Sequence, residues 1–234
     1  MKKLEPLHGK KELMLLSLNN NNKERGFSLL EMSVVLAIAL VMMSVATLSL
    51  RPALKDVHVN QGYNSTLAQI RKARESAVEG RQQYIVCFGT HTPSGATTPM
   101  GTPTAQSITV YQWTSSTALS AAVEVSQITL PSDIQFLVVS GIPTSAATVP
   151  DGFGTGAVAL DLDKGVAGGA VDQIMFQPDG SARDTNGNLN NGVLYMARSG
   201  ELYSSRAISL FGASGRVRGW RLVNSSGTAS WIQQ

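Results

Sequence analysis

The 234-residue chain carries 19 basic and 16 acidic residues, for a formal net charge of +3. Its length has room for one globular domain of modest size together with N-terminal segments outside that domain. Because Cys87 is the single cysteine, an intrachain disulfide is excluded, and we expect a fold stabilised by its core. Cys87 lies in the apolar run Tyr84–Phe88, so we interpret it as a buried core thiol.

The first 26 residues hold the excess positive charge. They contain six Lys and Arg residues and three Glu residues, so 13 of the 19 basic and 13 of the 16 acidic residues follow them. Lys and Arg beside an apolar helix keep that end in the cytoplasm, which places the rest of the chain on the outer face of the membrane. The net charge therefore indicates topology and not a nucleic-acid partner. Met1 and Met14 are both consistent with the start of this segment.

An apolar segment follows from Phe27 to Leu50, with Glu31 as its one charge. At about 1.5 Å per residue, a helix of that length reaches ~36 Å and can cross a hydrocarbon core of ~30 Å. An ionisable side chain in such a helix costs at least ~2.5 kcal/mol unless a cation meets it. A cut after Gly26 would supply one, the new α-amino group of Phe27, either in the same chain or in a neighbouring subunit of a polymer.

The run Gly26-Phe27-Ser28-Leu29-Leu30-Glu31 resembles the prepilin cleavage and methylation motif of type IV pilins and type II secretion pseudopilins, whose usual form has Thr in place of Ser28. The resemblance implies that prepilin peptidase cuts after Gly26 and methylates Phe27, and that Glu31 serves assembly. An ordinary signal anchor is the alternative. A secretory signal peptide fits less well, because the apolar run ends at Arg51-Pro52 and not at a small-residue cleavage site.

Beyond Pro52 the pattern becomes that of an amphipathic helix. Its apolar stripe consists of Tyr63, Leu67, Ile70, Ala73 and Ala77, and its charged positions are Arg71, Lys72, Arg74, Glu75 and Glu79. We expect this helix to extend the anchor, to lay its stripe against a sheet and to end at Gly80. Pro52 and Gly62 are predicted kinks or breaks.

The rest of the chain predicts an antiparallel β domain, because short apolar runs alternate with Gly, Pro, Asn, Asp and Ser. The expected strands are Tyr84–Phe88, Ile108–Trp113, Val123–Leu130, Ile134–Val139, Val158–Leu162, Ile174–Phe176, Val193–Ala197, Ala207–Phe211 and Val217–Val223. Two stretches, Thr90–Ser107 and Ser140–Gly156, read as exposed loops.

Patterns typical of catalysis are missing from the sequence. His8, His58 and His91 lack partners at the spacing of a catalytic triad, so we predict that the chain is not an enzyme and takes no cofactor. The oxygen-rich run from Asp179 to Asn190 lacks the glycine and the glutamate that a calcium-binding loop requires at fixed positions. A turn capped by Asp and Asn side chains is therefore the better interpretation. Asp161 and Asp163 are an equally weak calcium candidate, and no metal site is predicted.

From Arg198 to Gln234 the chain carries five arginines and a single acidic residue, Glu201. Strand alternation puts Arg216 and Arg218 on one face of Val217–Val223, where they could pair with the phosphates of DNA. Trp220 could then stack on a base or simply cap the core. The alternative is a solvated edge strand whose charges prevent aggregation.

Two short motifs make the resemblance more specific, to one family of minor pilins and pseudopilins. Gln173–Gly180 and the Gly215-Arg216-Val217-Arg218 element, together with the anchor helix, look like the GspH/FimT family of minor pilins and pseudopilins. That family's Gly-Arg-x-Arg element is associated with DNA uptake in some members and occurs in others with no known DNA role.

The resemblance implies an α+β, type IV pilin-like fold, in which a long N-terminal helix packs on a C-terminal antiparallel β domain. The expected divisions are a leader (1–26), a transmembrane and polymerisation helix (27–50), an amphipathic extension (51–80) and a periplasmic β-rich domain (81–234).

The resemblance further implies a minor subunit of a type II secretion pseudopilus or a type IV pilus, acting at the tip or in initiation. Its partners would be other pilin or pseudopilin subunits, prepilin peptidase and inner-membrane lipid, with DNA as a partner in the alternative function. The chain would start in the inner membrane with its C-terminal domain in the periplasm. A plain membrane-anchored sensor or enzyme is a third hypothesis.

Overall fold

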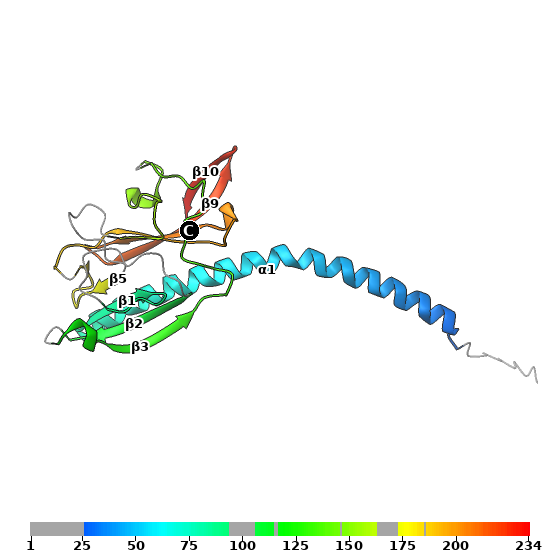
Figure 1. The fold of residues 1–234 in the computed structure, drawn as a ribbon, viewed down its shortest axis with the longest axis horizontal. Coiled ribbons are helices and arrows are strands. Elements are labelled where there is room, and N and C mark those ends of the chain that lie inside the picture. Colours follow the sequence, from blue (N-terminus) through cyan, green and yellow to red (C-terminus); the bar gives the residue numbers. More distant parts are fainter. Residues whose placement is uncertain (1–25, 94–105, 115–116, 146, 163–172, 185) are drawn as a thin grey trace, which may run out of the picture. The chain divides into compact units, whose positions relative to one another are not determined.

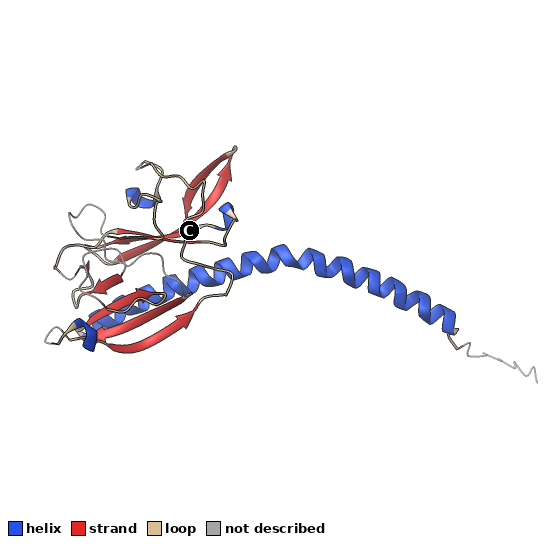
Figure 2. Cartoon of the chain, viewed as in Figure 1, coloured by secondary structure: helices blue, strands red, loops and turns tan. Residues whose placement is uncertain are grey.

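The computed structural model describes residues 26–93, 106–114, 117–145, 147–162, 173–184 and 186–234. It divides into two compact units, Met1–Leu48 and Ser49–Gln234. Helix α1 (Leu29–Gly80) contributes residues to both units, and every described strand belongs to the second (Figures 1 and 2). The predicted α+β order, a long helix followed by antiparallel strands, is confirmed. Of the predicted leader, only Gly26 falls within the described residues.

The first unit contains the apolar half of α1. Leu29–Thr47 is long and apolar enough to cross a membrane, and none of it is buried within the chain. An apolar surface of this extent requires cover by lipid or by other apolar helices.

In the second unit, α1 buries the predicted apolar stripe. Tyr63, Ile70, Ala73 and Ala77 are each at most 4% exposed, and Leu67 is half-buried. The charged positions are exposed except for Arg74, which is half-buried. The helix ends at Gly80 as predicted. The prediction of a break at Pro52 or Gly62 is wrong, because α1 continues as one helix through both residues.

Gly62 has a packing role instead of a breaking one. A Cβ on Gly62 would lie 3.2 Å from Cγ2 of Ile134, so the glycine lets α1 approach that side chain closely. At Pro52, a proline removes one main-chain hydrogen bond of the helix and crowds one turn. The helix can continue in spite of this cost because tertiary packing stabilises its C-terminal part.

Two five-stranded antiparallel sheets complete the second unit (Figure 2). The first sheet has the order β3-β2-β1-β5-β6, and the second has the order β10-β9-β8-β7-β4. The strands of the first sheet are β1 (Gln83–Phe88), β2 (Ser107–Trp113), β3 (Val123–Thr129), β5 (Gln173–Phe176) and β6 (Ala182–Arg183). The strands of the second are β4 (Leu160–Leu162), β7 (Gly192–Met196), β8 (Arg206–Phe211), β9 (Arg216–Ser225) and β10 (Thr228–Gln233). Short 3-10 turns lie at Leu119–Ala121, Pro150–Gly152 and Leu202–Ser204.

The main core joins α1 to both sheets. The helical stripe packs with Val86 and Phe88 of β1, and with Ile208 and Val217 of the second sheet. The opposite face of the second sheet carries its own cluster, in which Tyr195 and Leu222 pack with Trp220 and Trp231. Both faces of the second sheet are therefore covered over much of their area.

Several predicted strands differ in the structure. Ile134–Val139 is not a strand: Ile134 and Phe136 are buried, but only Gln135 forms a bridge, to Ala197. The apolar side chains there serve packing, with Phe136 edge-on to Phe88 at 5.4 Å. Val158 is likewise outside β4, and β6 and β10 had no counterpart in the prediction.

The predicted loops agree only in part with the structure. Residues 94–105 of Thr90–Ser107 lie outside the described residues, and Ser107 opens β2. The second stretch is irregular as expected but not exposed throughout, because Ile142, Val149 and Pro150 are buried.

The single cysteine is a core residue, as predicted. Cys87 is buried beside Ile85 and Met175, and burial raises the pKa of its thiol to about 12. At neutral pH the thiol therefore stays protonated and unreactive.

Candidate functional site

The segment from Gly26 to Ser28 precedes α1 and is exposed. A Cβ at Gly26 would meet nothing within 4 Å, and both residues of the Gly26–Phe27 peptide bond are exposed. Phe27 is 74% exposed. An accessible, non-helical peptide bond is what a peptidase requires.

Ser28 caps the start of α1. Its Oγ accepts a hydrogen bond from the main-chain N–H of Leu30 at 3.3 Å, and its carbonyl accepts from the N–H of Met32 at 3.0 Å. Serine is a preferred residue at this position because its hydroxyl satisfies a free N–H of the first turn. The hydroxyl retained at position 28 thus has a structural reason.

Glu31 lies in the first turn of α1 and is exposed. Negative charge is favoured there by the helix dipole, worth about 0.3–1 kcal/mol at an exposed site. Ser28 and Glu31 also have the three-residue spacing of a capping box. Glu31 therefore has a local structural role available besides the assembly role that the motif implies.

The C-terminal arginines lie in different environments, and two of them, Arg206 and Arg198, are engaged within the fold. Arg206 is 1% exposed: its guanidinium donates to Oδ1 of Asn60 on α1 at 3.0 Å and to main-chain carbonyls of residues 203–205. Burial, with Arg221 as the next cause, lowers the pKa of Arg206 to about 10. Arg198 is paired with Asp133 at 3.2 Å. The C-terminal excess of arginines is therefore not one cationic surface.

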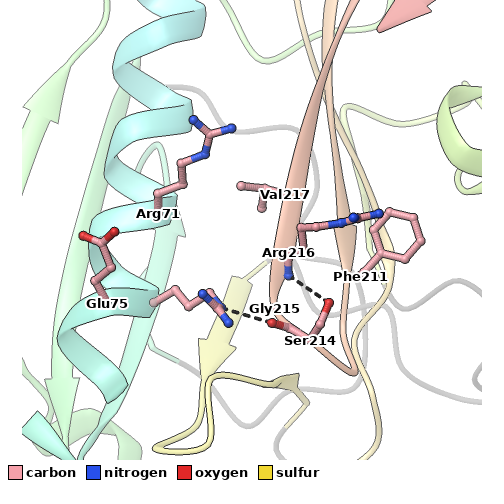
Figure 3. Close-up of a pocket in the computed structure, with 8 residues that line it drawn as sticks. Arg71, Glu75, Phe211, Ser214, Gly215, Arg216 and Val217 are labelled. Carbon is pink, nitrogen blue, oxygen red and sulfur yellow. Dashed lines mark hydrogen bonds between the residues drawn. The ribbon is translucent and has the colours of Figure 1, made fainter. Parts of the chain in front are cut away.

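Arg216 and Arg218 share one face of β9, and the guanidinium groups lie 5.2 and 5.1 Å from the centre of the Phe211 ring. Val217 between them is buried on the opposite face. Figure 3 shows the Arg216 side chain running to the Phe211 ring and away from α1.

Asp151 distinguishes the two arginines. Its Oδ1 accepts from Nη1 of Arg218 at 2.5 Å, while Ser209 donates to its Oδ2 and Trp220 donates to Ser209 at 3.0 Å. Arg218 is thus neutralised, whereas among the described residues no carboxylate lies within 4 Å of the Arg216 guanidinium. Sequence reasoning missed Asp151; the turn sequence Pro150-Asp151-Gly152 marked a turn but gave no sign of its partner.

β9 is not an edge strand of the second sheet as a whole, because β10 pairs with it from Trp220 to Ser225. Its first residues pair only with β8, so the predicted edge is retained where Arg216 and Arg218 lie. Trp220 packs against the cluster on the outer face of the second sheet, which favours the core-capping interpretation over base stacking.

A groove of about 620 Å³ lies between α1 and the β8–β9 turn, lined by Arg71, Arg74, Glu75, Phe211 and 214–217 (Figure 3). Arg74 is held in place, since its Nε donates to the carbonyls of Gly180 at 3.2 Å and Ser214 at 3.0 Å. Arg71 is exposed and points from α1 toward β9 in Figure 3. The sequence had placed Arg71 on a solvated helix face with no partner element.

The oxygen-rich turn at Asp184 is a capped turn, as predicted. Oδ1 of Asp184 accepts the N–H groups of Asn186 and Asn188, and Oδ2 accepts from the Asn188 amide. Asp179 is likewise engaged by Ser181, whose hydroxyl and N–H hold the Asp179 pKa below its usual value. Thr185 and Asp163 lie outside the described residues. No group of three or more metal-ligating side chains occurs among the residues that are described.

The histidines form no catalytic arrangement within the described part of the chain. His58 lies on α1 with Nδ1 3.2 Å from the Asp133 carboxylate, which also pairs with Arg198. His91 lies in the loop after β1, and His8 is outside the described residues.

A family model described as the prokaryotic N-terminal methylation motif matches residues 21–47. This match confirms the predicted prepilin motif and covers the N-terminal segment alone. No curated protein sequence matches the chain.

Two solved structures are similar to the chain at low identity. The type IV minor pilin FimU of Pseudomonas aeruginosa is 11% identical over 77% of this chain and 95% of its own, with a TM-score of 0.39. The minor pseudopilin EpsH from the type 2 secretion system of Vibrio cholerae is 10% identical over 74% and 92%, with a TM-score of 0.29.

Proposed function

We propose that this chain is a minor pilin or pseudopilin, a structural subunit that is anchored in the inner membrane and assembles with other pilin-like subunits. The observation that carries the proposal is the methylation motif at 21–47, placed directly before an unburied apolar helix with Glu31 in its first turn. A helix of this kind can exchange lipid for the helices of neighbouring subunits without changing its own structure.

The filament is a type II secretion pseudopilus or a type IV pilus, and the subunit belongs to its tip or initiation complex. The short motifs at Gln173–Gly180 and Gly215–Arg218 support this placement in a GspH/FimT-like group. The excess of Lys and Arg before Gly26 supports an N-terminus in the cytoplasm and a β domain in the periplasm. The role is structural and not enzymatic.

Replacing Gly26 with leucine is expected to leave the chain unprocessed, because prepilin peptidase must accommodate residue 26 beside the scissile bond. An immunoblot of the membrane fraction should then show only the precursor. Ser44→Leu, an equally bulky change further along the exposed helix, should be processed normally. Normal processing of the Gly26→Leu chain would contradict the proposed cleavage site.

DNA binding is the second candidate function, and it is favoured by the Arg216 guanidinium, which has no carboxylate within 4 Å among the described residues. Arg216 and the exposed Arg71 are both free to meet phosphates, whereas Arg218 is held by Asp151. Phosphate contacts would give binding that is independent of sequence and strongly weakened by salt.

Arg216→Gln is expected to weaken DNA binding by the compact unit 49–234 and to reduce its salt slope by about 0.7–0.9, the value of one phosphate contact. Arg218→Gln should change the slope less, but should destabilise the unit by about 1 kcal/mol because Asp151 loses its ion-pair partner. Polarisation titrations at two salt concentrations and thermal melts separate the two effects. Undetectable binding of the unaltered unit at low salt would remove this second function.

A further inference from the structure

Four strands form the edges of the two sheets: β3, β6, β4 and β10. An edge strand presents unpaired N–H and C=O groups, and native proteins protect such edges by keeping them short, charged or irregular. β4 has three residues and β6 has two. β3 carries the exposed Glu124, and its pairing with β2 shifts register between Val110 and Tyr111. Three of the four edges therefore carry a protective feature.

The β10 edge carries none of these features. Its six residues, Thr228–Gln233, pair with β9 without a register shift. No charged residue and no proline occurs between Leu222 and the C-terminal Gln234. An unprotected edge of this length is a template for the addition of another strand.

The main-chain groups of alternate residues of β10 point away from β9. The N–H of Gln234 donates to the Gly219 carbonyl at 2.9 Å. Hydrogen-bonded pairs alternate along an antiparallel ladder, so the main-chain groups of Gln234, Ile232 and Ser230 bond to β9. The hairpin turn agrees, because Ser226 and Gly227 have φ angles of 53° and 86°, as a two-residue type I′ turn requires. The residues whose main-chain N–H and C=O groups point away from β9 are then Ala229, Trp231 and Gln233.

A groove of about 510 Å³ adjoins this edge. One wall is formed by Thr228–Trp231 and Trp220, and the other by residues of the 147–152 segment. The charged residue in its lining is Asp151, which is already paired with Arg218 and Ser209. The groove is thus aromatic, rimmed by hydroxyls and without a free charge in its lining.

We propose that β10 accepts an extended, uncharged strand from a different subunit, with hydrogen bonds to Ala229, Trp231 and Gln233. The added strand places an apolar side chain from every second residue against Trp220 and Trp231 in the groove. A charged side chain would be desolvated there without a partner, which excludes acidic and basic segments. The identity of the partner as another subunit rests on the proposed function; the strand-binding edge itself does not.

The test uses the purified full chain in detergent and a labelled, end-capped hexapeptide of alternating valine and threonine. Polarisation should show saturable binding, absent with empty micelles. N-methylation of the three residues on one edge of the peptide should weaken binding more than about tenfold, because main-chain hydrogen bonds are lost. The same methyl groups on its other edge should leave binding unchanged, which controls for apolarity.

Ala229→Pro removes one outward N–H and leaves the β9 pairing intact, so binding should weaken about fivefold, the equivalent of one hydrogen bond. Ala229→Ser keeps the N–H and should bind normally. Absent binding, or equal loss with methyl groups on either edge, would overturn the proposal. Self-association that Ala229→Pro abolishes, without peptide binding, would assign the edge to a second copy and also overturn it. Because none of these readouts depends on processing, failure here leaves the proposed function standing.

Discussion

Replacing Glu31 with glutamine or valine is expected to leave the chain in the membrane and to abolish its incorporation into a filament. Removing the carboxylate relieves at least ~2.5 kcal/mol of unfavourable insertion, so the monomer should remain anchored. In the assembled state, however, the terminal amine of a neighbouring subunit would lose its partner in a low-dielectric helical core, where an unpaired charge is costly. Crosslinking of the variant to partner subunits measures the loss.

The two substitutions separate charge from helix capping. Glutamine can still occupy the third helical position of a capping box with Ser28 and removes only the charge, whereas valine removes both. We expect both variants to fail to assemble, while Ser33→Val, two residues further along the same helix, should assemble normally. Normal assembly of the glutamine variant would assign Glu31 to capping and contradict the ion pair.

Gly219→Ala is expected to destabilise the second unit by about 3 kcal/mol, near the upper end of the usual range for an overpacked core. A Cβ at Gly219 would lie 1.4 Å from Oη of Tyr63 and 2.6 Å from Cζ, so α1 and β9 could not keep their present contact. For a unit of this size the melting temperature should fall by about 6–12 °C.

Matched variants locate the cause of that loss. Gly80→Ala meets only the Tyr84 side chain, at 3.8 Å, and should melt near the unaltered protein. Combining Gly219→Ala with Tyr63→Leu should cost less than the sum of the two single changes, because the clashing atoms are gone. If the losses of stability in the two single variants simply add in the double variant, Tyr63 is not the side chain that clashes with a Cβ at position 219.

Features that depend on local sequence were predictable. The stripe from Tyr63 to Ala77 follows from helical periodicity, and the end of α1 follows from Gly80. The segment from Gly26 to Glu31 is contiguous, so its chemistry could be interpreted without the fold.

Features that depend on strand order were not predictable. β9 was expected to be an exposed or edge strand, yet β10 (Thr228–Gln233), which was not predicted, pairs with it from Trp220 to Ser225. Asp151 reaches Arg218 across 67 positions of sequence, and no local pattern announces that contact. Arg206 was counted only as one of the five C-terminal arginines, and no local pattern predicted its burial beside Asn60 of α1.

The mass of the mature N-terminal peptide is the most direct test of prepilin processing at Gly26. The chain should be isolated from membranes of cells that contain prepilin peptidase, and its N-terminal peptide should be sequenced by mass spectrometry. We expect a chain that begins at Phe27 and carries one methyl group on its α-amino nitrogen. A mature chain that begins at any other residue, or an unmethylated Phe27 in such cells, would contradict this expectation.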